Sequence, residues 1–159
     1  MKRILSFVLI LCLALTLTGC TGEAEKDIRF YYLRTGESIR YGSADALIAP
    51  VALENSTSGD DLDHLLQQYL ERPIPENFRN PFPKGTYLLS TIARDDMLVI
   101  VLSREFSNLD GIRLTLAGAC LTATCHELAG YTHIQVRSGE KVYEFHYNDY
   151  IFLDNGAGE

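Results

Sequence analysis

The chain has 159 residues, with 14 Lys plus Arg against 21 Asp plus Glu, so its formal net charge is −7 with histidine neutral. Apolar residues make up 47% and charged residues 22%, which excludes a wholly disordered chain and suits one globular domain. The acidic excess and the lack of a Lys/Arg-rich run exclude a nucleic-acid partner, because phosphate binding needs a positively charged surface.

The amino terminus has the pattern of a signal peptide. Lys2 and Arg3 precede an apolar stretch over residues 4–17. As a helix this stretch would be about 21 Å long, short of the roughly 30 Å hydrocarbon core, so a cleaved segment is favoured over a permanent span. At the end of this stretch lies the sequence Leu17-Thr18-Gly19-Cys20. This sequence resembles the bacterial lipobox, in which the cysteine receives diacylglycerol and becomes the mature amino terminus.

This pattern predicts the organisation of the whole chain. We expect a lipoprotein signal peptide over residues 1–19, a lipidated polar tether over 20–27, a folded domain over 28–153 and a disordered tail over 154–159. Lipid and acyl chains such as palmitate on Cys20 would hold the protein in the cell membrane, with its domain on the extracytoplasmic face. The alternatives are a plain secretory peptide that contains a cysteine by chance, or a short membrane anchor.

The first half of the domain contains one clear helix. Residues 28–33 are rich in β-forming side chains, and apolar pieces around Pro50 allow at most an edge strand within 38–53. Over 58–72 the apolar residues recur at helical spacing, and Ser58 or Asp60 can cap the helix. Pro73 ends it, and a proline-rich connector follows over 73–83.

The second half alternates strands and a helix. Residues 86–92 and 97–103 predict a hairpin, whose second strand is apolar throughout and therefore central. A helix capped by Asn108 or Asp110 runs to Gly130, and strands follow over 132–136 and 141–147 with a turn at Gly139. This order predicts an α+β fold with two helices on one face of a single mixed sheet, a two-layer sandwich.

An aromatic cluster near the carboxyl terminus is a candidate binding face. Tyr143, Phe145 and Tyr147 alternate along the last strand and therefore share one face, and Tyr150 and Phe152 extend the cluster. Such a face can stack on a glycan or another small ligand. It can equally cover the core or a helix, and this second interpretation is favoured.

The residues that most often carry catalysis do not form a known set. Cys120 and Cys125 are about 7.5 Å apart along a helix axis and point in different directions, so we expect buried free thiols rather than a disulfide. The four histidines, His64, His126, His133 and His146, match no zinc-helix spacing, and no nucleophile elbow, P-loop or dinucleotide fingerprint is present. We expect no enzymatic activity, no metal and no cofactor.

Several stretches resemble the GerMN domain of bacterial sporulation and germination lipoproteins. They lie within residues 28–139 and are Phe30-Tyr31-Tyr32, Leu65-Leu66, Pro83-Lys84-Gly85-Thr86-Tyr87-Leu88-Leu89-Ser90, Val99-Ile100-Val101-Leu102-Ser103, Arg104-Glu105-Phe106 and Ile134-Gln135-Val136. The resemblance implies a ring-building type of domain, with two helices on a sheet, that works in assemblies at the membrane surface. It implies no catalytic residues. This chain departs from the germination proteins in having one copy and an aromatic extension after Gly139.

These observations predict a membrane-anchored lipoprotein whose domain binds protein partners or further copies of itself, with a link to sporulation or germination. The alternatives are an envelope lipoprotein that binds a small ligand or glycan through the Tyr143, Phe145 and Tyr147 face, and a cell-wall hydrolase of an unfamiliar type.

Overall fold

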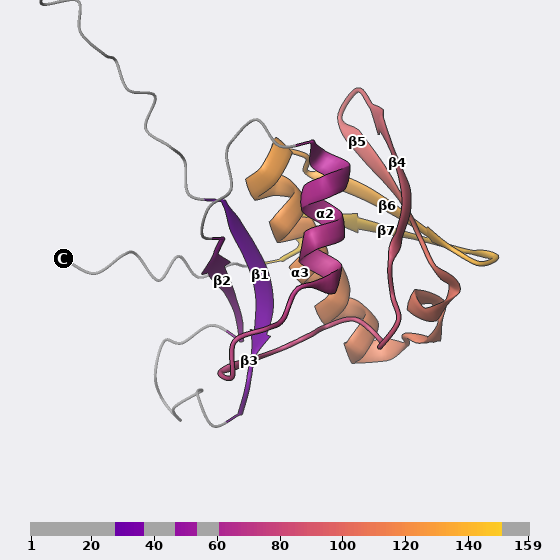
Figure 1. Cartoon of the computed structure of the whole chain (residues 1–159). Helices are drawn as coiled ribbons and strands as arrows, with labels where there is room; N and C mark the ends of the chain where they lie inside the picture. The colour runs from indigo at the N-terminus through magenta and orange to yellow at the C-terminus, as the bar shows by residue number, and fades with distance from the viewer. Residues whose placement is uncertain (1–27, 37–46, 54–60, 151–159) are drawn as a thin grey trace, which may run out of the picture.

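The strands in the described part of the chain form two sheets that enclose the helices between them (Figure 1). The computed structural model describes residues 28–36, 47–53 and 61–150. The strands in these ranges are β1 (Arg29–Arg34), β2 (Ile48–Ala52), β3 (Phe78–Arg79), β4 (Leu88–Arg94), β5 (Met97–Leu102), β6 (His133–Ser138) and β7 (Lys141–His146). The helices are α2 (Leu62–Glu71) and α3 (Gly111–Ala129), with short 3-10 helices η1 (Arg104–Asn108) and η2 (Tyr147–Asp149).

The smaller sheet has the order β2-β1-β3, and both of its strand pairs are antiparallel. Pro50 lies in β2 opposite Tyr31, so the proline is on an edge strand as predicted. The strand β3 was not predicted. It consists of Phe78 and Arg79 within the proline-rich connector and pairs with the end of β1.

The larger sheet has the order β4-β5-β6-β7. Two antiparallel hairpins, β4–β5 and β6–β7, meet at a parallel β5–β6 pair, and α3 is the crossover between them. The strand β5 is central, as its apolar sequence predicted, and Leu98, Val99, Ile100 and Leu102 are buried. The hairpin β4–β5 begins at Leu88 rather than at Thr86.

Both predicted helices are present. The stripe of α2 is confirmed, because its buried residues are Leu65, Leu66, Tyr69 and Leu70. The predicted caps Ser58 and Asp60 lie outside the described residues; the residue before the helix is Asp61, whose side chain makes no capping hydrogen bond. The helix α3 follows Asp110 and ends at Gly130, where φ is 76°, a left-handed conformation that glycine adopts readily.

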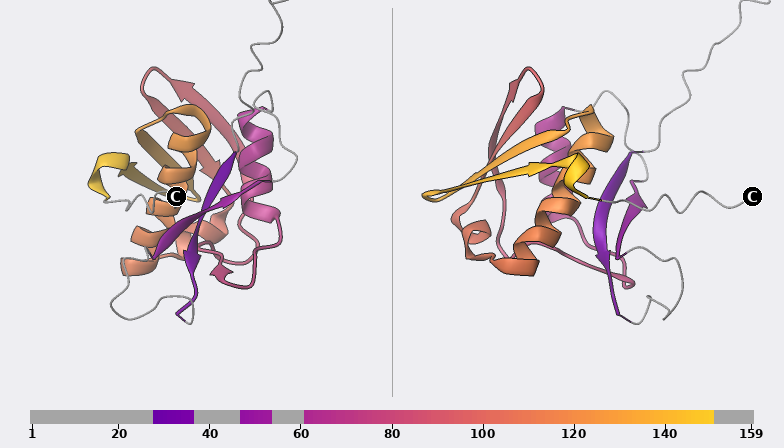
Figure 2. Two further views of the ribbon diagram at one scale, coloured as in Figure 1. Left: turned by 90° about the vertical axis from the view of Figure 1, so that its left-hand side faces the viewer. Right: turned by 180° about the vertical axis from the view of Figure 1, so that it is seen from behind.

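The arrangement of the layers differs from the predicted single sheet with both helices on one face. The α+β class is confirmed, but α2 and α3 lie between two sheets, so the domain has three layers (Figure 2). The cause is the middle of α3, where every residue from Ala117 to Cys125 is buried. A helix that is buried on all sides needs cover on opposite faces, and one sheet cannot provide it.

Small side chains in α3 allow the two sheets to approach it closely. Ala117, Gly118, Ala119 and Ala123 are all buried. On the side of the smaller sheet, the backbone N–H of Tyr31 donates a hydrogen bond of 3.0 Å to Oγ1 of Thr124. The helix therefore connects the two sheets and fixes their positions relative to one another.

Candidate functional site

The predicted lipid attachment residue, Cys20, lies outside the described residues, as do the signal peptide, the tether and the tail. Within residues 28–36, 47–53 and 61–150, no helix has the length and apolar character needed to cross a bilayer.

The aromatic residues of β7 do not form one open face. Tyr143 and Phe145 share a side of the strand as predicted, but that side faces the core: Phe145 is only 7% exposed, and Tyr143 packs against the core with its ring 5.7 Å from that of Phe106. Tyr147 belongs to η2, and its ring lies 4.0 Å from the ring of His126. The burial of Phe145 agrees with the favoured interpretation, in which this face covers the core. Tyr143 and Tyr147 are partly buried, so the three rings do not form one open platform.

Cys120 and Cys125 are free and buried, as predicted. Burial disfavours the charged thiolate and raises the pKa of both thiols far above the ordinary range. A thiol reacts as its thiolate, so these two side chains act as small apolar core residues rather than as nucleophiles.

A different cluster forms on the opposite side of the β6–β7 hairpin. A two-residue turn joins Ser138 to Lys141, and its first residue, Gly139, has φ of 59°, which glycine adopts without strain. This register places His133 directly opposite His146. Because side chains alternate along a strand, both histidines point away from the face that carries the buried Phe145.

Glu144 completes this cluster from the same face. It is two residues from His146 on β7 and directly opposite Gln135. Ligand atoms of His133, Glu144 and His146 all lie within 4.8 Å of one another. Two imidazoles and a carboxylate at this separation are a donor set that suits a divalent transition metal.

The geometry of the two histidines is well defined. Their rings are stacked, with centroids 4.1 Å apart and an interplanar angle of 22°. Next to them, the backbone N–H of Tyr147 donates to the carbonyl of Thr132 at 2.8 Å. Since hydrogen-bonded and non-hydrogen-bonded pairs alternate in an antiparallel ladder, His133 and His146 form a non-hydrogen-bonded pair, the kind in which side chains lie closest.

Neighbouring polar side chains orient the carboxylate. Nε2 of Gln135 donates a hydrogen bond of 3.2 Å to Oε1 of Glu144. In turn, Nε of Arg137 donates a hydrogen bond of 2.9 Å to Oε1 of Gln135. Nε2 of His133 is buried and has no hydrogen-bond partner among the described residues.

Helical spacing of histidines does not reveal this cluster, because its residues lie on two paired strands. The relevant signal was the symmetry of the hairpin around its turn. A two-residue turn at Gly139 and Glu140 places residues equally distant from it opposite one another, and His133 and His146 are such a pair.

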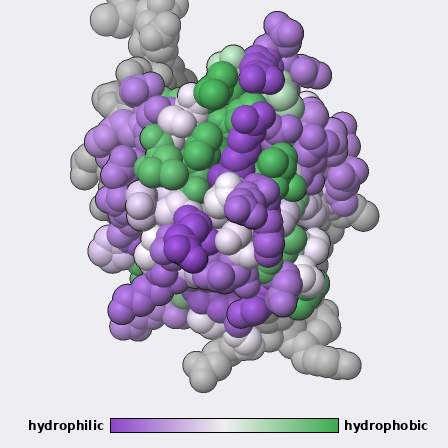
Figure 3. Space-filling model, turned by 90° about the vertical axis from the view of Figure 1, so that its right-hand side faces the viewer, coloured by the Kyte–Doolittle hydropathy of each residue, from purple (hydrophilic) through white to green (hydrophobic). Residues whose placement is uncertain are grey.

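The outer face of the larger sheet also carries apolar side chains. Ile92 on β4 is 45% exposed and Val142 on β7 is 57% exposed. Register places Ile92 opposite Val99 and Val142 opposite Arg137, on the face that points away from the helices. Figure 3 views the molecule from this side and shows green apolar atoms among purple polar ones.

Comparisons with known proteins provide one structural neighbour. No model of a known protein family matches the chain, and no curated protein is significantly similar in sequence. A crystal structure named "Putative Lipoprotein from Clostridium perfringens" is similar at 19% identity and a TM-score of 0.41, over 82% of this chain and 93% of that chain. The GerMN resemblance therefore rests on the residues of the sequence alone.

Proposed function

We propose that this protein is a lipoprotein, attached through Cys20 to the extracytoplasmic face of a bacterial cell membrane, and that its domain binds other proteins rather than catalysing a reaction. The observation that carries the proposal is Leu17-Thr18-Gly19-Cys20 at the end of an apolar segment preceded by Lys2 and Arg3. Only a cysteine thiol can form the thioether to the lipid, so the position of this residue has a direct chemical meaning.

The described residues support binding rather than catalysis in two ways. The thiols of Cys120 and Cys125 are buried with raised pKa values, and so do not serve as nucleophiles. The outer face of the larger sheet exposes Ile92 and Val142, apolar side chains of the kind that protein contacts bury. A lipid anchor confines such a domain to the membrane surface and raises its effective concentration near other membrane proteins.

The GerMN resemblance supports a more specific role, in an assembly formed at the membrane during sporulation or germination. A strain of the source bacterium that lacks this chain would then form fewer viable spores or germinate more slowly. Normal spore formation and germination in that strain would contradict this role and leave a general envelope function.

The anchor is tested by labelling cells with radioactive palmitate. The wild-type protein should take up label and enter the detergent phase on phase partitioning, whereas Cys20→Ser should take up none. Cys12→Ser is the matched control, since it removes a thiol from the same segment and should leave labelling unchanged. Equal label in the wild type and Cys20→Ser would contradict attachment at Cys20.

The binding role is tested by chemical crosslinking of the full-length protein in intact membranes. We expect discrete crosslinked species that are lost in Ile92→Glu, which places a charge on the outer face of the larger sheet. Ile112→Glu is the matched control, because Ile112 is 70% exposed at the start of α3. Monomer alone, at every crosslinker concentration, would contradict the proposal.

A further inference from the structure

We propose that His133, His146 and Glu144 form a binding site for one divalent transition-metal ion of the zinc type on the outer face of the β6–β7 hairpin. The inference does not depend on the proposed function, because it rests on the positions of three side chains within the described residues. It concerns a surface that faces solvent, away from the core.

The donor chemistry selects the class of ion. Imidazole nitrogens bind zinc and its neighbours in the first transition row, whereas magnesium and calcium prefer oxygen donors throughout. Two histidines and a glutamate leave at least one position of a tetrahedral ion for water. The single carboxylate leaves the complex with a net charge of +1, which the acidic protein tolerates easily.

The distances require only small side-chain movements. Tetrahedral coordination at the usual zinc bond lengths of about 2.0–2.2 Å separates ligand atoms by about 3.4 Å. The three ligand atoms are already within 4.8 Å of one another, and all three side chains retain contact with solvent. Rotation about side-chain bonds can therefore close the site without moving the backbone.

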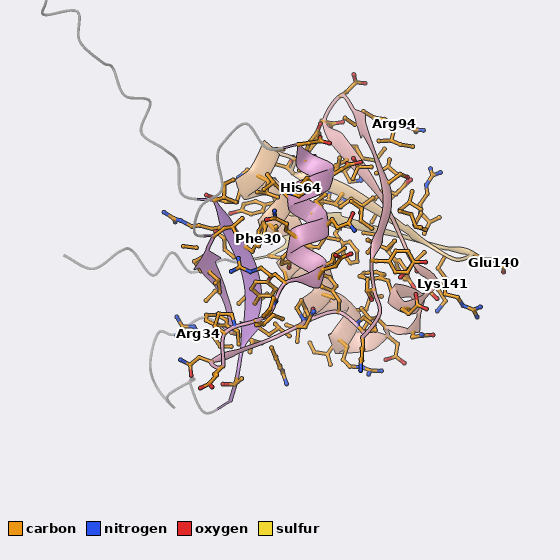
Figure 4. The ribbon with its side chains drawn as sticks, viewed as in Figure 1. Phe30, Arg34, His64, Arg94, Glu140 and Lys141 are labelled. Carbon is orange, nitrogen blue, oxygen red and sulfur yellow. The ribbon has the colours of Figure 1, made fainter. Side chains whose placement is uncertain are left out.

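The backbone beneath the site is held on several sides. Oγ of Ser138 donates a hydrogen bond of 2.7 Å to the carbonyl of Ser103, and Nζ of Lys141 donates one of 2.8 Å to the carbonyl of Ser107. These contacts fix the turn end of the hairpin to η1, and Figure 4 shows Lys141 and the neighbouring Glu140 at this tip. At the other end, Tyr147 bonds to Thr132 beside the two histidines. A rigid hairpin keeps the donors together before an ion arrives, which lowers the entropic cost of binding.

Two further observations agree with a metal site. The hydrogen bond from Gln135 to Glu144 orients the carboxylate, as outer partners of metal ligands commonly do. Nε2 of His133 is buried and has no hydrogen-bond partner among the described residues. Coordination of an ion by this nitrogen would give it the polar partner that it lacks.

The test is zinc titration of the full-length, tag-free protein in detergent, by isothermal calorimetry and by thermal unfolding with and without a chelator. We expect one ion per chain, a melting temperature that zinc raises by a few degrees, and no response to magnesium. His133→Ala and His146→Ala should each weaken binding at least tenfold, and Glu144→Gln should weaken it several-fold. His64→Ala and Glu140→Gln are matched controls, since His64 lies on α2 and Glu140 at the hairpin tip (Figure 4), and both should bind zinc as the wild type does.

Two outcomes would overturn the proposal. Either the wild type binds no zinc, or the double variant His133→Ala/His146→Ala binds zinc with the same affinity as the wild type. If an alanine variant unfolds, His146→Asn keeps a polar side chain of similar length on the strand and takes its place. Zinc should also shift the imidazole proton resonances of His133 and His146 but not those of His64. Equal shifts at His64 would show surface binding without a defined site.

Discussion

Gly118 on α3 and Phe145 on β7 are in direct contact: a β-carbon on Gly118 would lie 2.3 Å from the nearest carbon of the Phe145 ring. Real β-carbons do not approach other atoms so closely, so this contact requires glycine. The ring of Phe145 thereby sits directly on the helix backbone. The contact sets the distance between α3 and the hairpin whose outer face carries His133, Glu144 and His146.

Gly118→Ala should therefore destabilise the protein. The added methyl group forces the Phe145 ring or the helix to move, and over-packing of this kind costs about 1–3 kcal/mol. The higher helix propensity of alanine offsets up to about 1 kcal/mol of that loss. Urea unfolding followed by circular dichroism measures the result. Gly36→Ala is the control, because nothing lies within 4 Å of a β-carbon there, and its stability should change by less than about 0.5 kcal/mol.

A second variant identifies the cause of the loss. Gly118→Ala/Phe145→Leu removes the ring that the methyl group would strike, so the two substitutions together should cost less than the sum of their separate effects. Strict additivity would show that the contact between these two residues is not what limits position 118.

Tyr69→Phe should destabilise the protein at a different junction. The hydroxyl of Tyr69 on α2 donates a hydrogen bond of 2.7 Å to the carbonyl of Tyr31, and the hydroxyl of Tyr32 donates one of 2.9 Å to the carbonyl of Tyr69. Loss of the Tyr69 hydroxyl leaves a carbonyl of β1 without this donor, at a cost of about 1–3 kcal/mol. Tyr87→Phe is the control: Tyr87 is 48% exposed, and its replacement should change the midpoint of urea unfolding little.

The same two tyrosines should make stability fall at alkaline pH. Burial raises the pKa of both Tyr32 and Tyr69 well above the ordinary value near 10. In the unfolded chain these hydroxyls lose their protons as the pH passes about 10, while in the folded protein they keep them. The unfolded state then binds fewer protons, so the free energy of unfolding decreases by about 1.4 kcal/mol per pH unit for each such group.

Unfolding by urea at a series of pH values measures this decrease. The Tyr69→Phe variant, which has one fewer buried hydroxyl, should show a shallower slope above pH 10 than the wild type. Cys120 and Cys125 contribute in the same direction from slightly lower pH, because burial raises the pKa of their thiols too. A stability that is constant up to pH 12 would contradict the burial of these groups.

Periodicity explains which parts of the fold were predictable. In α2 the apolar residues recur at helical spacing, which indicates a helix with one buried face. In β5 the residues are apolar throughout, which indicates a strand covered on both faces. Both elements were predicted correctly. The division into two sheets was not predictable in this way, because the small residues of α3 fit either a partly covered helix or a fully enclosed one. The two-residue strand β3 depends on pairing with β1, a tertiary contact that leaves no periodic signal.

The cluster of His133, Glu144 and His146 also depends on tertiary pairing that the sequence pattern does not show. His133 and His146 are unremarkable in the sequence, and only the register of the β6–β7 hairpin makes them neighbours. A shift of one residue in the register would remove His146 from its place opposite His133. For Phe145 the alternation of side chains along the strand correctly predicted that it shares a face with Tyr143. The same alternation does not indicate which face of the strand is buried.

Burial should protect the two core thiols, Cys120 and Cys125, from chemical reagents. Cys120 and Cys125 should not react with a disulfide reagent in native buffer, and both should react in denaturant, because they are exposed only on unfolding. Val142→Cys is the matched control, since position 142 is 57% exposed on the outer face of β7. Its thiol should react natively at a rate on the order of 10³ or more times that of the core thiols. Equally fast reaction of Cys120 in the native wild type would contradict the enclosure of α3 between the two sheets.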